Sequence, residues 1–195
     1  MARAGRLVKP AVQELIRLTV LRRARLSPGW MRVTLGGGEI DRFTPMGYDQ
    51  WFRIFLPLGG DDGLERIPAK ANKLFGYLRY LRIPDGVRPV MRNYSLSNAP
   101  GDEYYRISVK REAAPVDDAP DGVCSNHLHA NLKEGDRVEL APPAGEFVLD
   151  TREQDAPVVL IAGGVGITPL LSMLHQCLAA SPASRPVTLI QGALG

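Results

Sequence analysis

Short apolar runs separated by turn residues fill the first two thirds of the chain. In each run Val, Ile, Leu, Thr and aromatic residues alternate with polar ones, which is typical of strands. The pattern predicts strands at 15–24, 31–35, 50–56, 90–97, 104–111 and 137–140, and helices at 69–82 and 125–132. We expect 90–97 and 104–111 to form a hairpin around the turn at Asn98–Asp102. Many short antiparallel strands with one small helix favour a closed Greek-key barrel.

The pattern changes at Ala156-Pro157. An all-apolar stretch, 158–162, is followed by glycines, a helical stretch at 168–179 and a second apolar stretch at 187–190. This is one βαβ unit, the building block of a parallel sheet whose strands are buried. We therefore predict an antiparallel β-barrel followed by the start of an α/β parallel-sheet lobe. The predicted divisions are a basic leader at 1–14, the barrel at 15–150 and the lobe at 157–195.

Composition and charge narrow the class of protein. With 45% hydrophobic residues and no biased repeat, the chain is globular, and its net charge of +3 is too small to indicate nucleic-acid binding. Two cysteines cannot form a disulfide framework, so a cytoplasmic location is expected. The uncharged run 157–184 is interrupted by three glycines and Pro169, so we expect no membrane-spanning helix.

Three short motifs carry candidate chemistry. On a strand, Arg92 and Tyr94 share one face, where a guanidinium suits a pyrophosphate and an aromatic ring can lie against a heteroaromatic one; Ser95 adds a small polar group beside them. Gly122-Val123-Cys124-Ser125 opens a predicted helix, whose first N–H groups attract anions; Ser125 is alternatively a simple helix cap.

The third motif runs from Gly163 to Pro169, directly after a buried strand and before a helix. Its glycines permit a tight turn and close approach of a dinucleotide phosphate, and Thr168 is expected to cap the helix. A metal site formed by Cys124, His127, His129 and His175 is disfavoured, because their spacing does not bring three ligands to a common face.

These motifs, in this order, resemble the ferredoxin–NADP reductase superfamily, and most of all the reductase half of flavohaemoglobins. Arg92-x-Tyr94-Ser95, 107–112, 122–129, Pro143–Phe147 and Gly164–Pro169 carry the likeness. The stretches 31–37 and 83–92 also resemble siderophore-interacting flavoproteins.

The resemblance implies FAD in the barrel and NADH or NADPH on the lobe. The residues that it implies for FAD binding are Trp51, Arg92, Asn93, Tyr94, Ser95, Val109, Lys110, Gly122, Val123 and Ser125. Those that it implies for the nicotinamide dinucleotide are Gly164, Val165, Gly166, Ile167, Thr168 and Pro169. Ser95, near the flavin, and Thr168, near the nicotinamide, are the implied catalytic residues.

The lobe is shorter than the resemblance leads one to expect. Only 39 residues (195 − 156) follow Ala156, and a βαβ unit takes ~30. We expect this sequence to be a truncated form, or one completed by self-association or a partner chain.

The sequence thus predicts an FAD-dependent oxidoreductase that passes hydride from NAD(P)H to flavin and then electrons to an acceptor: a haem protein, an iron–sulfur protein or a ferric chelate. Two alternatives stay open. One is a ferric-siderophore reductase that binds its chelate near the basic helix at 70–82. The other is a non-catalytic flavin-binding fragment.

Overall fold

The computed structural model describes residues 14–43, 51–57, 62–70, 74–98, 103–114, 121–145, 147, 149, 156–180 and 185–192. Residues 1–13 of the predicted leader lie outside these ranges. No helix in the described part of the chain has the length and apolar character needed to cross a membrane.

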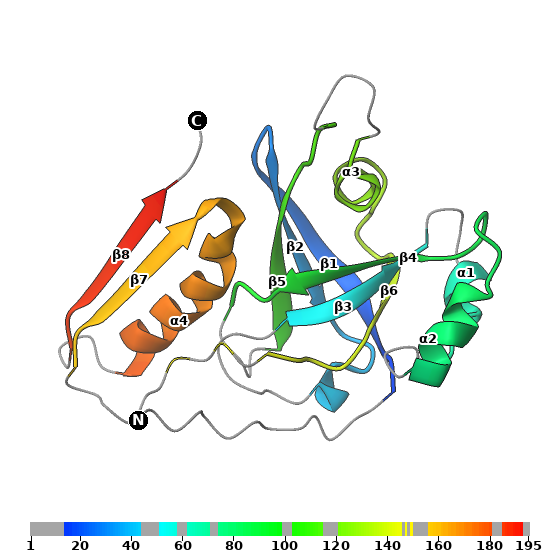
Figure 1. The fold of residues 1–195 in the computed structure, drawn as a ribbon, viewed down its shortest axis with the longest axis horizontal. Coiled ribbons are helices and arrows are strands. Elements are labelled where there is room, and N and C mark those ends of the chain that lie inside the picture. The colour runs from blue at the N-terminus through cyan, green and yellow to red at the C-terminus, as the bar shows by residue number, and fades with distance from the viewer. Residues whose placement is uncertain are drawn as a thin grey trace.

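Six antiparallel strands form one sheet in the order β4-β3-β6-β1-β2-β5 (Figure 1). The strands are β1 (Ile16–Ser27), β2 (Trp30–Gly36), β3 (Trp51–Leu56), β4 (Val90–Ser95), β5 (Tyr104–Lys110) and β6 (Arg137–Leu140). Alternate side chains point inward and form one apolar core, as the period of two requires. The predicted barrel is confirmed, and its strand positions agree with the predictions to within about three residues at each end.

The predicted hairpin of β4 and β5 is wrong. β4 pairs with β3, and β5 pairs with β2, so the two strands are the opposite edges of the sheet. They approach each other only beyond β4, where the Ser97 N–H donates to the Arg106 carbonyl oxygen at 2.9 Å. Since this contact joins the two edges, the sheet is a nearly closed barrel. Residues 99–102 of the predicted turn lie outside the described ranges.

Four short helices lie outside the sheet: η1 (Ile40–Arg42), α1 (Asp62–Glu65), α2 (Leu74–Leu81) and α3 (Val123–Ala130). The predicted helix at 69–82 is shorter than expected, with Ala69 and Lys70 in a turn, and α1 was not predicted. Helices α1 and α2 cover the outside of the barrel at one end, over a small apolar cluster around Phe55 and Tyr80.

The predicted βαβ unit is confirmed. β7 (Val158–Gly163) and β8 (Val187–Gly192) pair in parallel, and η2 (Gly164–Gly166) and α4 (Ile167–Ala180) connect them. Helix α4 lies between the two strands and the barrel (Figure 1). Helix α4 covers one face of the two strands only, so this single βαβ unit leaves Ile161 and Ile190 on the other face exposed.

One buried side chain joins the lobe to the barrel. The hydroxyl of Ser172 on α4 is fully buried and donates to the carbonyl oxygens of Leu96, at 2.8 Å, and Asn98, at 3.3 Å. Leu96 directly follows β4, so α4 is fixed to the end of the strand that carries Arg92 and Tyr94. The barrel thereby sets the position of the glycine turn that precedes α4.

Candidate functional site

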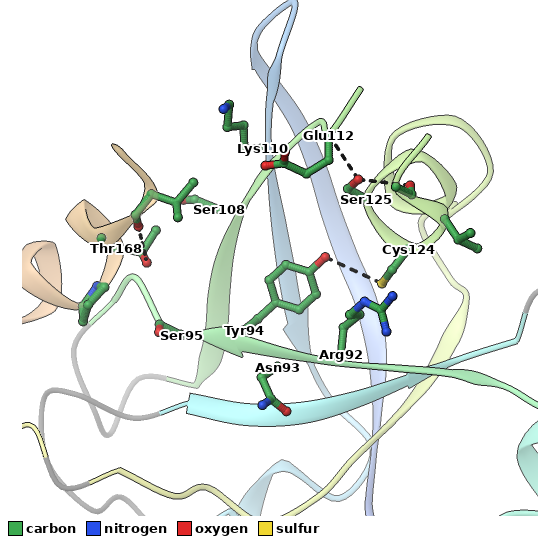
Figure 2. A pocket seen from close by; sticks show the side chains of 15 residues that line it. Arg92, Asn93, Tyr94, Ser95, Ser108, Lys110, Glu112, Cys124, Ser125 and Thr168 are labelled. Carbon is green, nitrogen blue, oxygen red and sulfur yellow. Dashed lines mark hydrogen bonds between the residues drawn. The ribbon is translucent and has the colours of Figure 1, made fainter. Parts of the chain in front are cut away.

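The first candidate site is a cavity of about 450 Å³ between β4, β5, the start of α3 and the start of α4. It is lined by Arg92, Asn93, Tyr94, Ser95, Ser108, Lys110, Glu112, Gly122, Val123, Cys124, Ser125, Val165, Gly166, Thr168 and Pro169. Twelve of these fifteen were predicted as site residues from the sequence. Segments separated by more than 70 residues thus meet around one space (Figure 2).

Strand β4 presents the predicted Arg92 and Tyr94 together. Figure 2 shows both side chains rising from the same side of the strand, toward α3, with Asn93 on the other side, where its Oδ1 accepts a hydrogen bond from Arg53. The Tyr94 side chain is partly buried against the barrel core, and its remaining surface lines the cavity. An aromatic face and a planar cation are therefore available side by side, as the alternation of the strand predicted.

A hydrogen bond holds the ring of Tyr94 at its outer end. Its hydroxyl lies 3.6 Å from the Sγ of Cys124 on α3. Burial raises the pKa of Tyr94 above its usual range and also raises the pKa of the Cys124 thiol. Both groups are therefore neutral at physiological pH, and the cavity beside them carries the charges of Arg92, Lys110 and Glu112 only.

At the start of α3, the backbone of Gly122 lies close to that of Glu112, and its N–H donates to the Glu112 carbonyl oxygen at 3.1 Å. A Cβ added at Gly122 would lie 2.8 Å from the Cβ of Glu112 and 2.9 Å from the Oγ of Ser125, so glycine is required there. The prediction that Ser125 caps the helix is wrong. Ser125 lies inside the first turn, where its Oγ donates to the Gly122 carbonyl oxygen and accepts from the Glu112 N–H. It ties β5 to α3 and leaves the N-terminal end of the helix facing the cavity.

The second candidate site is a larger cavity, of about 810 Å³, between the barrel and the lobe. It is lined by Leu26, Trp30, Arg32, Ser108, Lys110, Gly163, Gly164, Val165, Ile167, Thr168, Leu171, Leu189, Gln191 and Gly192. Two of these residues are cationic and none is acidic. The barrel side is set by strand register, since Arg32 pairs with Ser108 and Trp30 with Lys110 across β2 and β5.

The glycine turn forms the lobe side of this second cavity. Gly164 has a φ of 51°, in the left-handed region that glycine adopts at little cost. Helix α4 begins at Ile167, and the Thr168 hydroxyl donates to the Val165 carbonyl oxygen at 3.1 Å. The prediction that Thr168 caps the helix is therefore wrong, since its side chain donates to a carbonyl instead of accepting from an N–H.

The two cavities share a wall. Ser108, Lys110, Val165 and Thr168 line both of them. A ligand in the first cavity and a ligand in the second would therefore meet over the end of β5 and the start of α4.

Two predicted residues line neither cavity. The Val109 side chain is buried in the barrel core, and half-buried Trp51 pairs with Ser95 and with Ala144. Gly164 and Ile167 line the second cavity only. All the other predicted site residues line the first.

Sequence reasoning missed Ser108, Glu112 and Cys124 in the first cavity, and the barrel wall of the second. Ser108 has a signal, because it lies two residues before Lys110 and hence on the same face of β5. Arg32 and Trp30 have no such signal, since only the pairing of β2 with β5 brings them to the second cavity.

Among the residues that the structure describes, no group of three or more His, Cys, Asp or Glu side chains is placed to hold a metal ion.

Two family models match the chain. The siderophore-interacting FAD-binding domain matches residues 19–147, and the oxidoreductase NAD-binding domain matches residues 160–194. The first covers the barrel and the second the βαβ unit. They agree with the cofactors that the sequence predicted, FAD for the barrel and a nicotinamide dinucleotide for the lobe.

Curated relatives and solved structures agree with these models. Flavohemoprotein A of Dictyostelium discoideum is 54% identical over 103 residues, which is 53% of this chain and 25% of that protein. A flavohemoprotein of Rhodopirellula baltica is 57% identical over 91 residues, 47% of this chain and 22% of that one. This chain therefore spans about a quarter of the length of the curated relatives that it matches.

The structure of the flavohem-like FAD/NAD binding domain of nitric oxide dioxygenase from Vibrio cholerae is similar with a TM-score of 0.65 and 29% identity, covering 93% of this chain and 64% of that one. Ferredoxin-NADP+ reductase from Plasmodium falciparum shares the fold, with a TM-score of 0.63 and 17% identity over 93% of this chain and 60% of that one. The predicted resemblance is confirmed.

Proposed function

The chain belongs to the family of siderophore-interacting FAD-binding domains, within the ferredoxin–NADP reductase superfamily, and we propose that it accepts hydride from NADH or NADPH and delivers electrons to a separate acceptor. The observation that carries the proposal is the wall shared by the two cavities. Hydride transfer requires the donor and acceptor rings in contact, and adjoining cavities with common lining residues provide that arrangement.

The first cavity fits FAD by the chemistry of its lining. Arg92 and the N-terminal end of α3 supply positive charge for a pyrophosphate, and Tyr94 supplies an aromatic face. Glycine at 122 lets the start of α3 pack closely against Glu112 beside the cavity. When bound, FAD supplies the two-electron acceptor for hydride and releases electrons singly.

In this proposal, Arg92 and the start of α3 would bind the FAD phosphates, Tyr94 would orient the ring system, and Ser95 would contact it. Gly164–Gly166 would admit the phosphates of the nicotinamide dinucleotide, and Thr168, which lines both cavities, would contact both ligands. Val123 and the other predicted residues that line the cavities would surround the ligands, whereas Trp51 and Val109 support them from the barrel. Ser95 and Thr168 are the proposed catalytic residues, with Ser172 fixing one relative to the other.

The second cavity supports a role for two further cations. Arg32 and Lys110 face the glycine turn across it, with no acid among its lining residues. We expect them to stabilise the phosphates of the nicotinamide dinucleotide, with the Trp30 ring beside them.

The visible spectrum of the purified chain tests the proposal. We expect a yellow protein that bleaches anaerobically when NADH or NADPH is added. A protein that binds FAD but stays yellow would support the alternative, a non-catalytic flavin-binding fragment. A chain that binds no flavin after reconstitution with FAD would refute the assignment of the first cavity.

A pair of substitutions on β4 tests the FAD site itself. Arg92→Ala should weaken FAD binding about tenfold or more, because it removes a charge-assisted contact. Asn93→Ala is the comparison variant and should weaken FAD binding less, since the Asn93 side chain points to the other side of the strand and bonds to Arg53. Equal FAD affinity in the two variants would contradict the assignment.

The acceptor is proposed to be a haem protein or an iron–sulfur protein. A ferric chelate is a second candidate, supported by the family model over residues 19–147. Chelate reduction is measured as Fe(II) released with NADPH as donor. A chelate reduced at the first cavity would not contact α2, because no residue of α2 lines that cavity.

We further propose that 15–150 and 157–195 act as the flavin and donor domains of a cytoplasmic enzyme. Self-association or a partner chain would cover the exposed face of β7 and β8.

A further inference from the structure

Helix α2 presents four large apolar side chains to solvent. Leu74 is 69% exposed, Phe75 81%, Leu78 45% and Leu81 43%. The opposite side of the helix is buried against the barrel, where Tyr80 packs on Phe55 in an edge-to-face contact of 5.6 Å. A contiguous group of exposed apolar side chains marks an interaction site, so the outward face of α2 is a candidate for one.

Two arginines lie on the same outward arc. Successive residues of a helix are turned by about 100°, so Leu74, Leu78 and Leu81 form one stripe, with Phe75 and Arg79 on its flank. Arg82 continues the arc just beyond the last turn. Both arginines are exposed, and neither forms an ion pair with another described residue. Helix α2 itself contains no acidic residue, so the arc is apolar and positively charged.

We propose that the outward face of α2 binds the surface of an anionic lipid bilayer. Leu and Phe flanked by Arg on one face is the composition of helices that lie in a membrane interface. A second copy of the chain is a poor occupant, because a two-fold contact between α2 helices would bury arginines against a helix that offers no acidic residue to pair with them.

The location of α2 agrees with this occupant. It lies at the end of the barrel away from the lobe (Figure 1), and none of its residues lines either cavity. A chain bound through α2 would therefore keep both cavities open to soluble ligands. The cytoplasmic leaflet carries anionic lipids, which matches the proposed location of the enzyme.

Vesicle co-sedimentation of the full chain tests the inference. We expect the chain to bind vesicles of phosphatidylcholine and phosphatidylglycerol, to bind vesicles of phosphatidylcholine alone much more weakly, and to be released by salt. Phe75→Ser should weaken binding at least about tenfold. The double variant Arg79→Gln/Arg82→Gln should weaken it about thirtyfold.

Matched variants elsewhere separate α2 from general effects. Phe147→Ser changes another exposed phenylalanine, and Arg22→Gln/Arg25→Gln removes the same charge from β1. Both controls should bind as the unchanged chain does, and every variant should retain its thermal midpoint. The inference is overturned if the anionic vesicles bind no chain, if the controls lose binding equally, or if Phe75→Ser instead abolishes a concentration-dependent dimer. None of these outcomes depends on flavin or on reductase activity, so the proposed function is tested separately.

Discussion

Replacing Ser172 by alanine removes the buried link between the lobe and the barrel. The Ser172 hydroxyl is fully buried and donates to the Leu96 carbonyl oxygen at 2.8 Å, with the Asn98 carbonyl oxygen at 3.3 Å sharing the same proton. Thr168 lies one turn earlier on α4, and Ser95 directly precedes Leu96. The variant therefore weakens the contact between α4, which carries Thr168, and the end of β4, which carries Ser95.

The magnitude follows from one good and one long hydrogen bond. Loss of the donor leaves a buried carbonyl oxygen without this partner, which costs about 1–3 kcal/mol. For a chain of this size, 1 kcal/mol lowers the thermal midpoint by about 2–4 °C. With a cost of about 2 kcal/mol, the Ser172→Ala midpoint should therefore fall by about 4–8 °C. Hydride transfer should slow as well, because the donor and acceptor rings are held less accurately.

Scanning calorimetry measures the first effect, and stopped-flow bleaching of the flavin by NADPH measures the second. Ser172→Cys is the conservative variant, since it keeps the size of the side chain and a weak donor, and should lie between the other two. Ser27→Ala, at the end of β1, controls for loss of a hydroxyl elsewhere. A Ser172→Ala protein with an unchanged midpoint and an unchanged bleaching rate would refute the role of this link.

Three further predictions concern the cavities and the pH dependence. Gly122→Ala should lower the free energy of unfolding by about 1–3 kcal/mol and weaken FAD binding, because the new Cβ meets Glu112 and Ser125 at under 3 Å; urea unfolding and FAD titration measure both. Arg32→Gln should raise the KM for NADPH about tenfold and leave FAD affinity unchanged, because it removes a cation from the second cavity only. Burial lowers the pKa of His127 below 6.5, so the unfolded chain binds the proton first, and the free energy of unfolding should fall as the pH drops below about 6.5; His127→Gln should flatten this dependence.

Each of these has a control within the chain. Gly29 has no atom within 4 Å of an added Cβ, so Gly29→Ala should change neither stability nor FAD affinity. Arg22→Gln removes an exposed charge from the neighbouring strand and should leave the KM unchanged. For the third, the unchanged chain and His127→Gln are compared at each pH, so that the difference between them isolates the contribution of His127. A control that behaves like its variant would contradict the local cause given for that variant.

Local spacing identified much of the first cavity. The alternation of a strand places Arg92 and Tyr94 on one side of β4, and this holds whatever the strand pairs with. The glycine turn between an apolar strand and a helix was equally readable, since the βαβ unit is built from residues adjacent in sequence. Gly122 was likewise predicted from its neighbours in sequence, because it directly precedes the residues that form α3.

The errors share a cause. The turn residues at 98–102 predicted a hairpin, but β4 and β5 each pair with another strand and form opposite edges of the sheet. Ser125 and Thr168 are good caps by residue type, yet both donate to carbonyl oxygens. A residue's capacity to form a bond is local, whereas the partner that it finds depends on which segments pack beside it.

The sequence by itself determined which residues lie on a common strand face, the approximate positions of the strands, and the order of barrel and lobe. Those properties depend on backbone periods of 2 and 3.6 residues. Only the tertiary structure decided that Arg32 faces the glycine turn, that Ser172 joins the lobe to the barrel, and that α2 keeps an apolar face in solvent. These depend on strand register and on packing between segments far apart in the chain, which no local pattern encodes.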